Sequence, residues 1–434
     1  MESKLVTAKR AQLDELTGLR FIAAFCILIA HASHWLSPTQ PPHSVINWIM
    51  KSAGIGMPLF FVLSGFVIHY NYGRMFDRLT FNGYFKYVFA RFSRIYPLYF
   101  FLLTVALFTD SYLVSLLRQN AEYLNGFISC LTVSHSWFYY LLDGKLLINK
   151  IFGLSWSIST EFFFYFAYPF ISVFVLNTIS GTRKAFIFFL FCMVAPLIVF
   201  WWGFCRQEEI YLFMARYFEP ISGVQNNSVS RWLWYFSPYS RIFEFIAGVS
   251  VAKLYICIME NHRYFGFIQR HLTGAIALAI QICVHVFFVV ILFIELPYIQ
   301  FIRQNFLLAP MISMLMLSLL LCKTAINKIY TSKLMIMLGE ASFSIYIIQT
   351  WTLKLFLPHL APYSGTFLPA QWASHVVVAM TYSIVIALGT YKVIELPAKQ
   401  FLRNLSLQYQ SIVTYFGVIT LLIGLSSALL RLFY

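Results

Sequence analysis

The chain is short of charge: only 11% of its 434 residues are Asp, Glu, Lys or Arg, and only 16 of them are acidic. Soluble domains carry about 25% charged and about 45–50% apolar residues, whereas 60% of this chain is hydrophobic. So few charges cannot cover the surface of a soluble protein of this size, and disordered chains are excluded as well. The sequence also lacks a fixed-period repeat and a low-complexity linker. A single integral membrane domain over residues 1–434 fits this composition.

Cysteine and metal-ligand patterns offer little. Of the seven cysteines, only Cys130 and Cys205 lie away from the apolar runs, so we expect at most one disulfide. His31 and His34 are one helical turn apart, but no third and fourth ligand follow at zinc spacing, and we expect no metal site. The net charge is +15, yet Lys and Arg are scattered between apolar runs and form no stripe. We therefore expect no nucleic acid partner.

Long apolar runs dominate the chain. A helix crosses the hydrocarbon core with about 20 apolar residues, and we count about eleven such runs. The expected fold class is all-α: a polytopic membrane protein with about 10–11 transmembrane helices. The expected spans are 19–36, 54–70, 95–117, 152–176, 186–204, 238–258, 272–294, 304–322, 336–357, 372–392 and 411–431. Residues 118–150 are mixed and predict an amphipathic or re-entrant segment.

The basic residues predict the orientation. With the N-terminus in the cytoplasm, the inner segments carry roughly twice as many Lys and Arg residues as the outer ones. The chain also begins like a signal peptide, with a basic start, an apolar stretch and Ala30-His31-Ala32. Because the stretch continues through Trp35 and Leu36 and further spans follow, we interpret it as the first transmembrane helix.

The first span holds two ionisable residues, Arg20 and His31. An ionisable group in a span costs about 2.5–3.5 kcal/mol on insertion scales, so it needs a reason. Eleven residues of helix are three turns plus about 20°, which places both on one face and about 16 Å apart along the axis. That arrangement suits a long ligand with an anionic head and a buried reactive end. The alternative is a snorkelling arginine and a histidine bonded to a neighbouring helix.

A second basic pair, Arg91 and Arg94, also shares one helix face. Two guanidinium groups so placed suit phosphate. Ordinary anchoring of a cytoplasmic segment explains them equally well.

Further polar residues lie in later spans. Glu161 is the only acid of its span, and a carboxylate could orient an imidazole for base work. Arg241 and Glu244 suit a local ion pair, and the hydroxyls near Ser344 are more often contacts between helices. The expected additional lining of a site comprises Ser64, Trp156, Ser157, Arg241, Glu244, Ser344 and Tyr346.

Taken together and in order, these blocks resemble one family. They are Arg20 ten residues before His31, the block from Gly56 to Gly65, Arg91-x-x-Arg94 before Ile95-Tyr96-Pro97, Trp156-Ser157-Ile158-Ser159-x-Glu161, Arg241-x-x-Glu244, and Ser342 to Tyr346. The chain resembles the membrane acyltransferase family 3, the polytopic O-acyltransferases of bacterial glycans. The resemblance covers residues 10–400, and 411–431 is an additional C-terminal span.

The resemblance implies a cytosolic acyl-CoA donor, usually acetyl-CoA, and an acceptor hydroxyl on the extracytoplasmic side. Arg20 and His31 match the family's essential motif, Arg91 and Arg94 its second arginine motif, and Glu161 the acid of its tryptophan-serine block. Gln349 departs from the histidine of many members. Some members continue into an esterase-like domain, which does not follow here, so we expect direct transfer to the acceptor or transfer to a separate protein.

The resulting expectation is an O-acetyltransferase of a bacterial inner membrane. His31 would be the catalytic base, Glu161 or another acid would stabilise its protonated form, and Arg20, Arg91 and Arg94 would bind the donor. A covalent acyl-enzyme stays open. The co-substrate is acyl-CoA, with no permanent cofactor. The other partners are a glycan or lipid-linked glycan such as lipopolysaccharide, membrane lipid and, in one alternative, a second copy of the chain.

Two other functions compete. A glycan or small-molecule transporter or flippase also carries buried charges, although many transporters contain internal repeats and none is evident here. An acyltransferase of another fold, acting on a lipid or small-molecule hydroxyl, is the third interpretation. A test for consumption of a thioester separates the transporter or flippase, which consumes none, from the two acyltransferase interpretations.

Overall fold

The chain folds almost entirely into helices. The computed structural model describes residues 12–36, 44–217, 228–294, 306–356 and 369–408. The elements are α1 (Asp14–Leu36), α2 (Ser44–Met50), α3 (Ala53–Tyr72), α4 (Phe81–Thr109), α5 (Ser111–Gln119), α6 (Ala121–Leu131), β1 (Leu141–Leu142), β2 (Lys145–Leu146), α7 (Trp156–Phe174), α8 (Gly181–Cys205), α9 (Gln207–Tyr217), α10 (Val229–Arg231), α11 (Pro238–Glu260), α12 (His262–His271), α13 (Gly274–Phe293), α15 (Leu308–Leu321), α16 (Ala325–Tyr330), α17 (Lys333–Glu340), α18 (Ser342–Phe356), α19 (Pro369–Thr390) and α20 (Leu396–Gln408). A π-helical turn, Tyr391–Glu395, joins α19 to α20.

The described helices confirm a multi-pass membrane fold. Eight of them are long and apolar enough to cross a membrane, and α17 with α18 forms a ninth span if that pair, bent by 66°, is counted as one. The shorter α15 corresponds to the expected span 304–322. The expected span 411–431 lies outside the described residues.

The third span differs from the expected 95–117. Helix α4 begins after Thr80, whose side chain accepts a hydrogen bond from the backbone N–H of Gly83 at 3.2 Å, and it ends at Thr109. Its first half carries Lys86, Arg91 and Arg94, which lower the local hydropathy and conceal the helix from a search for apolar runs. The two arginines therefore lie well inside a helix and not at the end of a loop.

The mixed segment expected at 118–150 contains no helix long enough to span a membrane. Short helices α5 and α6 are followed by the antiparallel pair β1 and β2, in which Leu141 pairs with Leu146. The turn between the strands, Asp143-Gly144, has positive φ values of 46° and 68°. Positive φ at both central residues is the requirement of a two-residue type I′ hairpin. This hairpin is the exception to the expected all-α class.

Helices α3 and α11 pack closely at the centre of the molecule. A Cβ atom at Gly65 would lie 1.9 Å from the carbonyl oxygen of Phe245, and one at Gly248 would lie 1.8 Å from that of Val62. Only glycine permits such an approach, which is the usual way in which membrane helices pack. Because α11 covers one face of α3, this contact determines which face of α3 remains for packing against other helices.

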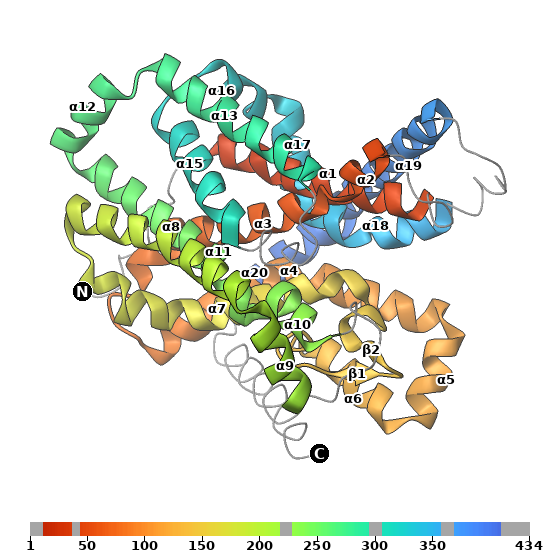
Figure 1. Cartoon of the computed structure of the whole chain (residues 1–434). Coiled ribbons are helices and arrows are strands. Elements are labelled where there is room, and N and C mark those ends of the chain that lie inside the picture. The colour runs from red at the N-terminus through yellow and green to blue at the C-terminus, as the bar shows by residue number, and fades with distance from the viewer. Residues whose placement is uncertain (1–11, 37–43, 218–227, 295–305, 357–368, 409–434) are drawn as a thin grey trace.

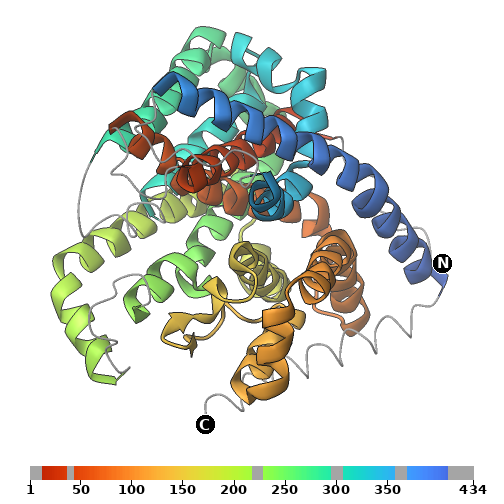
Figure 2. The same ribbon diagram turned by 90° about the vertical axis from the view of Figure 1, so that its right-hand side faces the viewer.

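Two groups of helices flank this centre (Figure 1). Helices α1, α2, α13 and α15 to α19 lie on one side, and α4 to α7 with the hairpin lie on the other. Helix α1 packs against α3, α17, α18 and α19, and α20 packs against α4. Figure 2 shows α19 and α20 as one continuous helix along the edge of the molecule. Side chains from both groups therefore meet between α1, α3, α4, α7 and α18.

Candidate active site

A cavity lies where these five helices meet. It encloses about 710 Å³ of space between atoms, part of it open to the outside. Its lining is Arg20 of α1; Met57, Phe60, Phe61, Leu63, Ser64, Val67 and Ile68 of α3; Arg91, Arg94 and Ile95 of α4; Ser157, Ile158, Glu161 and Tyr165 of α7; and Ser342, Phe343 and Tyr346 of α18. The fold thus brings together three basic residues and one acid that are far apart in the sequence.

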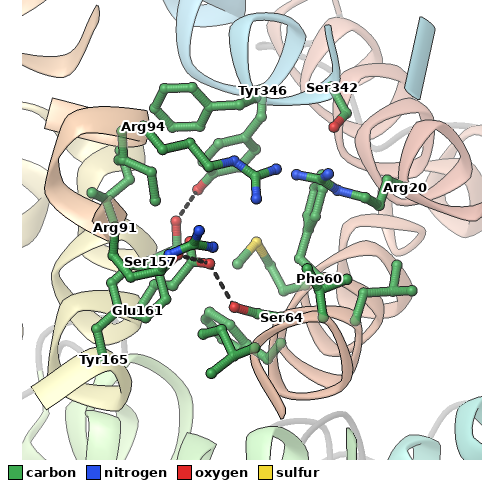
Figure 3. A pocket seen from close by; sticks show the side chains of 18 residues that line it. Arg20, Phe60, Ser64, Arg91, Arg94, Ser157, Glu161, Tyr165, Ser342 and Tyr346 are labelled. Atoms are coloured by element: carbon green, nitrogen blue, oxygen red, sulfur yellow. Dashed lines mark hydrogen bonds between the residues drawn. The ribbon is translucent and has the colours of Figure 1, made fainter. Parts of the chain in front are cut away.

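Arg20 and Arg94 define the basic end of the cavity. Figure 3 shows their guanidinium groups turned toward one another from opposite walls. Both side chains are half-buried, and neither forms a hydrogen bond or an ion pair with any residue that the structure describes. Two like charges facing each other in a partly dry cavity repel, so the arrangement favours an anion between them.

Arg91, the third arginine, is held by a tyrosine. Its Nη2 donates a hydrogen bond to the hydroxyl of Tyr72 at 2.6 Å, and the guanidinium lies 4.6 Å from the centre of that ring. Its Nε has no partner among the described residues. One edge of the guanidinium thus remains available to a ligand, while Tyr72 fixes its orientation.

Glu161 is the acid of the cavity. Its Oε1 accepts hydrogen bonds from the hydroxyls of Ser64, at 2.7 Å, and Tyr165, at 2.5 Å. The bond from Ser64 joins α7 to α3, whereas the bond from Tyr165 lies within α7. The hydrogen bonds of Glu161 therefore go to the cavity wall and not to His31, the residue that an acid was expected to support.

Tyr346 and Phe60 are aromatic members of the cavity lining. The Tyr346 hydroxyl lies 2.7 Å from Ser157 Oγ and 2.7 Å from the backbone oxygen of Leu154, which ties α18 to the start of α7. The ring of Phe60 meets that of Tyr346 edge-on, with centroids 5.8 Å apart. This ring contact joins α3 to α18.

His31 does not line this cavity. Its imidazole faces Gln349, one turn further along α18 than the cavity-lining Tyr346. The expected rotation of the first helix holds, because Arg20 shares the cavity with Ser342 of α18 and His31 faces the same helix. Arg20 lines the cavity and His31 does not, which helical geometry alone could not reveal.

Four other residues expected at the site lie outside the cavity lining. Arg241 and Glu244 form a fully buried ion pair at 2.8 Å, and Arg241 lies 5.7 Å from the centre of the Phe61 ring, behind the wall. Trp156 also packs behind Phe61. Ser344 points away and donates a hydrogen bond to Glu395 at 2.5 Å.

Comparison with known proteins identifies the family of the chain. A family model described as an acyltransferase domain, Acyl_transf_3, matches residues 13–392. The chain belongs to the acyltransferase 3 family. It is also similar to the acyltransferase MdmB of Streptomyces mycarofaciens, with 25% identity over 251 residues. That match covers 56% of this chain and 57% of MdmB, so the chain spans little more than half of this curated relative. No solved structure matches the chain.

Two residues near the basic end of this acyltransferase escaped the sequence reasoning. Glu395, in the π-helical turn, is buried, and its charge interacts with those of Arg20 and Arg94. Lys399 of α20 adds a further positive charge nearby. Glu395 is the only acid of residues 372–404, which is the criterion that selected Glu161. The expected span ended at 392, just before it.

Proposed function

We propose that this acyltransferase moves an acyl group, acetyl in the simplest case, from acyl-CoA to a hydroxyl of an extracytoplasmic glycan. The observation that carries the proposal is the pair of facing guanidinium groups of Arg20 and Arg94, with Arg91 beside them, in a cavity of an acyltransferase-family protein. Coenzyme A is polyanionic, and guanidinium groups bind phosphate through paired charge-assisted hydrogen bonds. We assign Arg20, Arg91 and Arg94 to the donor.

The apolar part of the same cavity supports an arm of the donor. Met57, Phe60 and Ile158 are apolar members of its lining. A chain about 16 Å long would be needed to reach from Arg20 to the level of His31 along α1. We propose that the pantetheine arm follows this path and that the rings of Phe60 and Tyr346 part when the donor binds.

His31 is the proposed general base. Its neutral imidazole accepts the proton of the acceptor hydroxyl while the oxygen attacks the thioester carbonyl, and the C–S bond then breaks. The released thiolate recovers the proton from the imidazolium, which leaves CoA as the free thiol. Glu161 contributes by holding Ser64 and Tyr165 in the donor cavity. With the N-terminus in the cytoplasm, the arginines face the donor's side and His31 lies toward the acceptor's side.

The proposal is tested with purified protein in liposomes, radiolabelled acetyl-CoA and envelope glycan from a strain that lacks the gene. We expect label in the glycan and release of free CoA thiol. His31→Ala should lower the rate by about 10²- to 10⁴-fold, the usual contribution of a general base. His34→Ala is the matched control, since His34 lies one turn away and is exposed.

Each outcome separates one interpretation. Wild-type protein that consumes no thioester would exclude acyl transfer and favour transport. Label in lipid and not in glycan would identify another acceptor class. Equal rates for His31→Ala and wild type would remove His31 from the mechanism. Mass analysis of envelope polysaccharide with and without the gene identifies the modified sugar.

A further inference from the structure

Gln349 is a buried amide between the cavity wall and His31. Its side chain has no exposed surface, and it lies on α18, which packs against α1. A buried amide without hydrogen bonds costs free energy, so its partners deserve an account. Because Tyr346 lines the cavity one turn earlier on the same helix, Gln349 connects the donor side to His31.

Only one half of this amide has a partner with good geometry. Nε2 of Gln349 donates a hydrogen bond to the backbone oxygen of Tyr346 at 2.8 Å. A backbone oxygen requires a donor, so this bond sets which way the amide points. Oε1 consequently lies on the other side, and among the described residues it has no hydrogen bond that meets strict geometric limits. The group that this amide faces is the imidazole of His31.

We propose that Gln349 is the positioning residue of His31, and that its Oε1 accepts a hydrogen bond from one ring N–H. This inference rests on the proposed role of His31 as the base. An imidazole that donates through one nitrogen has its other nitrogen free as an acceptor. The bond would therefore select the tautomer and point the basic nitrogen at the acceptor hydroxyl. When the imidazole takes the proton, the same oxygen stabilises the N–H of the imidazolium.

The charged residues around His31 explain why a neutral hydrogen-bond acceptor such as Gln349 matters to it. His34 on α1 is the titratable group whose charge acts on it. Lys354 of α18 lies 6.0 Å from the centre of the Trp35 ring, one turn further along α1. Helix α19, which packs against α1, carries His375, and Lys51 adjoins Ser52, whose hydroxyl donates a hydrogen bond to the backbone oxygen of Cys26 on α1. None of these is a carboxylate, so the support for the imidazolium comes from an amide dipole and not from a negative charge.

The test uses two substitutions and a matched control in the intact protein. Gln349→Leu keeps the size and removes the acceptor, so kcat should fall about 10- to 100-fold while KM for acetyl-CoA stays within about twofold. Gln349→Glu restores an acceptor, so it should recover most of kcat. Its negative charge favours the protonated ring, which should move the acid limb of the pH profile upward by about one unit or more. Gln281→Leu removes another fully buried glutamine, on α13, and should leave kcat unchanged.

The result that overturns the inference is a wild-type kcat in Gln349→Leu, or a Gln349→Glu enzyme as slow as Gln349→Leu with an unmoved acid limb. If Gln349→Leu does not yield folded protein, the Gln349→Glu profile decides alone. A merely structural role would not move that profile. Absence of turnover in wild-type protein would contradict the proposed function, whereas normal wild-type turnover with indifferent Gln349 variants contradicts this inference alone.

Discussion

The arginines of the membrane domain have two opposite environments, that of Arg241 and that of the cavity arginines Arg20 and Arg94. Arg241 is fully buried, paired with Glu244 at 2.8 Å, and surrounded by the rings of Phe61, Trp156 and Tyr235. Arg20 and Arg94 are half-buried and face one another without an acid bonded to either among the described residues. A charge in a membrane needs a reason. The charge of Arg241 is compensated inside the protein by Glu244, whereas the charges of the cavity arginines are there to bind a ligand.

The largest effect, a loss of stability, is expected from Arg241→Ala, which breaks the ion pair of Arg241 with Glu244. Removing one partner leaves a buried carboxylate at Glu244, a change that costs about 3–5 kcal/mol of stability. Arg206→Ala is the control, since Arg206 and Glu209 have the same i, i+3 spacing at the surface and should contribute less than about 1 kcal/mol. Thermal unfolding in detergent compares the two. Equal stability of both variants would mean that the Arg241–Glu244 pair is not structural.

Arg94→Ala should leave the stability of the protein unchanged and weaken the binding of the acyl-CoA donor. Charge-assisted hydrogen bonds contribute about 1.5–3 kcal/mol, so KM for acetyl-CoA should rise about 10- to 100-fold. Arg74→Ala is the control, because Arg74 forms an exposed pair with Glu260. Steady-state kinetics with both variants checks this. An unchanged KM in Arg94→Ala, or an equal rise in Arg74→Ala, would contradict the assignment.

Glu395→Gln should have a smaller and opposite effect. The Glu395 carboxylate lies near Arg20 and Arg94, and its charge opposes that of an anionic ligand. The amide can still accept the hydrogen bond of Ser344, so binding of CoA should tighten about two- to fivefold at low salt. Titration calorimetry measures the change, with Glu260→Gln as the surface control. Weaker binding would show instead that Glu395 holds the arginines in place.

The smallest effect is expected at the hairpin, far from Arg241 and from the cavity arginines. The hydrogen bond from Tyr123 and the ammonium group of Lys150, at 3.2 Å, lower the pKa of Asp143 below its ordinary value. A lowered pKa stabilises the folded hairpin above the ordinary value of about 3.9, and this stabilisation is lost as the pH falls through the folded-state value. Protease cleavage in the hairpin should therefore increase below about pH 4 in wild type. Asp143→Asn should be cleaved at a rate independent of pH in that range, and an acid-induced increase in this variant would contradict the assignment.

The sequence alone predicts much of the difference between the buried ion pair and the cavity residues, and the reason is physical. Arg20 and Glu161 stand out because charge is rare in apolar spans, and Arg91 stands out with Arg94 because their i, i+3 spacing suits phosphate; the structure brings these residues to one cavity. The i, i+3 spacing of Arg241 and Glu244 predicts their ion pair, which the structure contains.

Other features could not be obtained in this way. Helical periodicity gives the rotation of His31 about α1, but only tertiary packing reveals that Arg20 lines the cavity and His31 does not. Its neighbour Gln349 is uncharged, so no rule about buried charge selects it. The Asp143-Gly144 hairpin did carry a local signal, the strongest short one for a type I′ turn, which a search for apolar spans overlooks.

Equilibrium binding of coenzyme A to the purified protein tests the central claim most directly. The wild-type protein should bind CoA with an affinity that falls as salt rises, because the contact is between guanidinium groups and phosphates. The double variant Arg20→Ala/Arg94→Ala should lose about a hundredfold or more in affinity while its thermal unfolding stays at the wild-type temperature. A double variant that binds CoA as tightly as wild type would contradict the account.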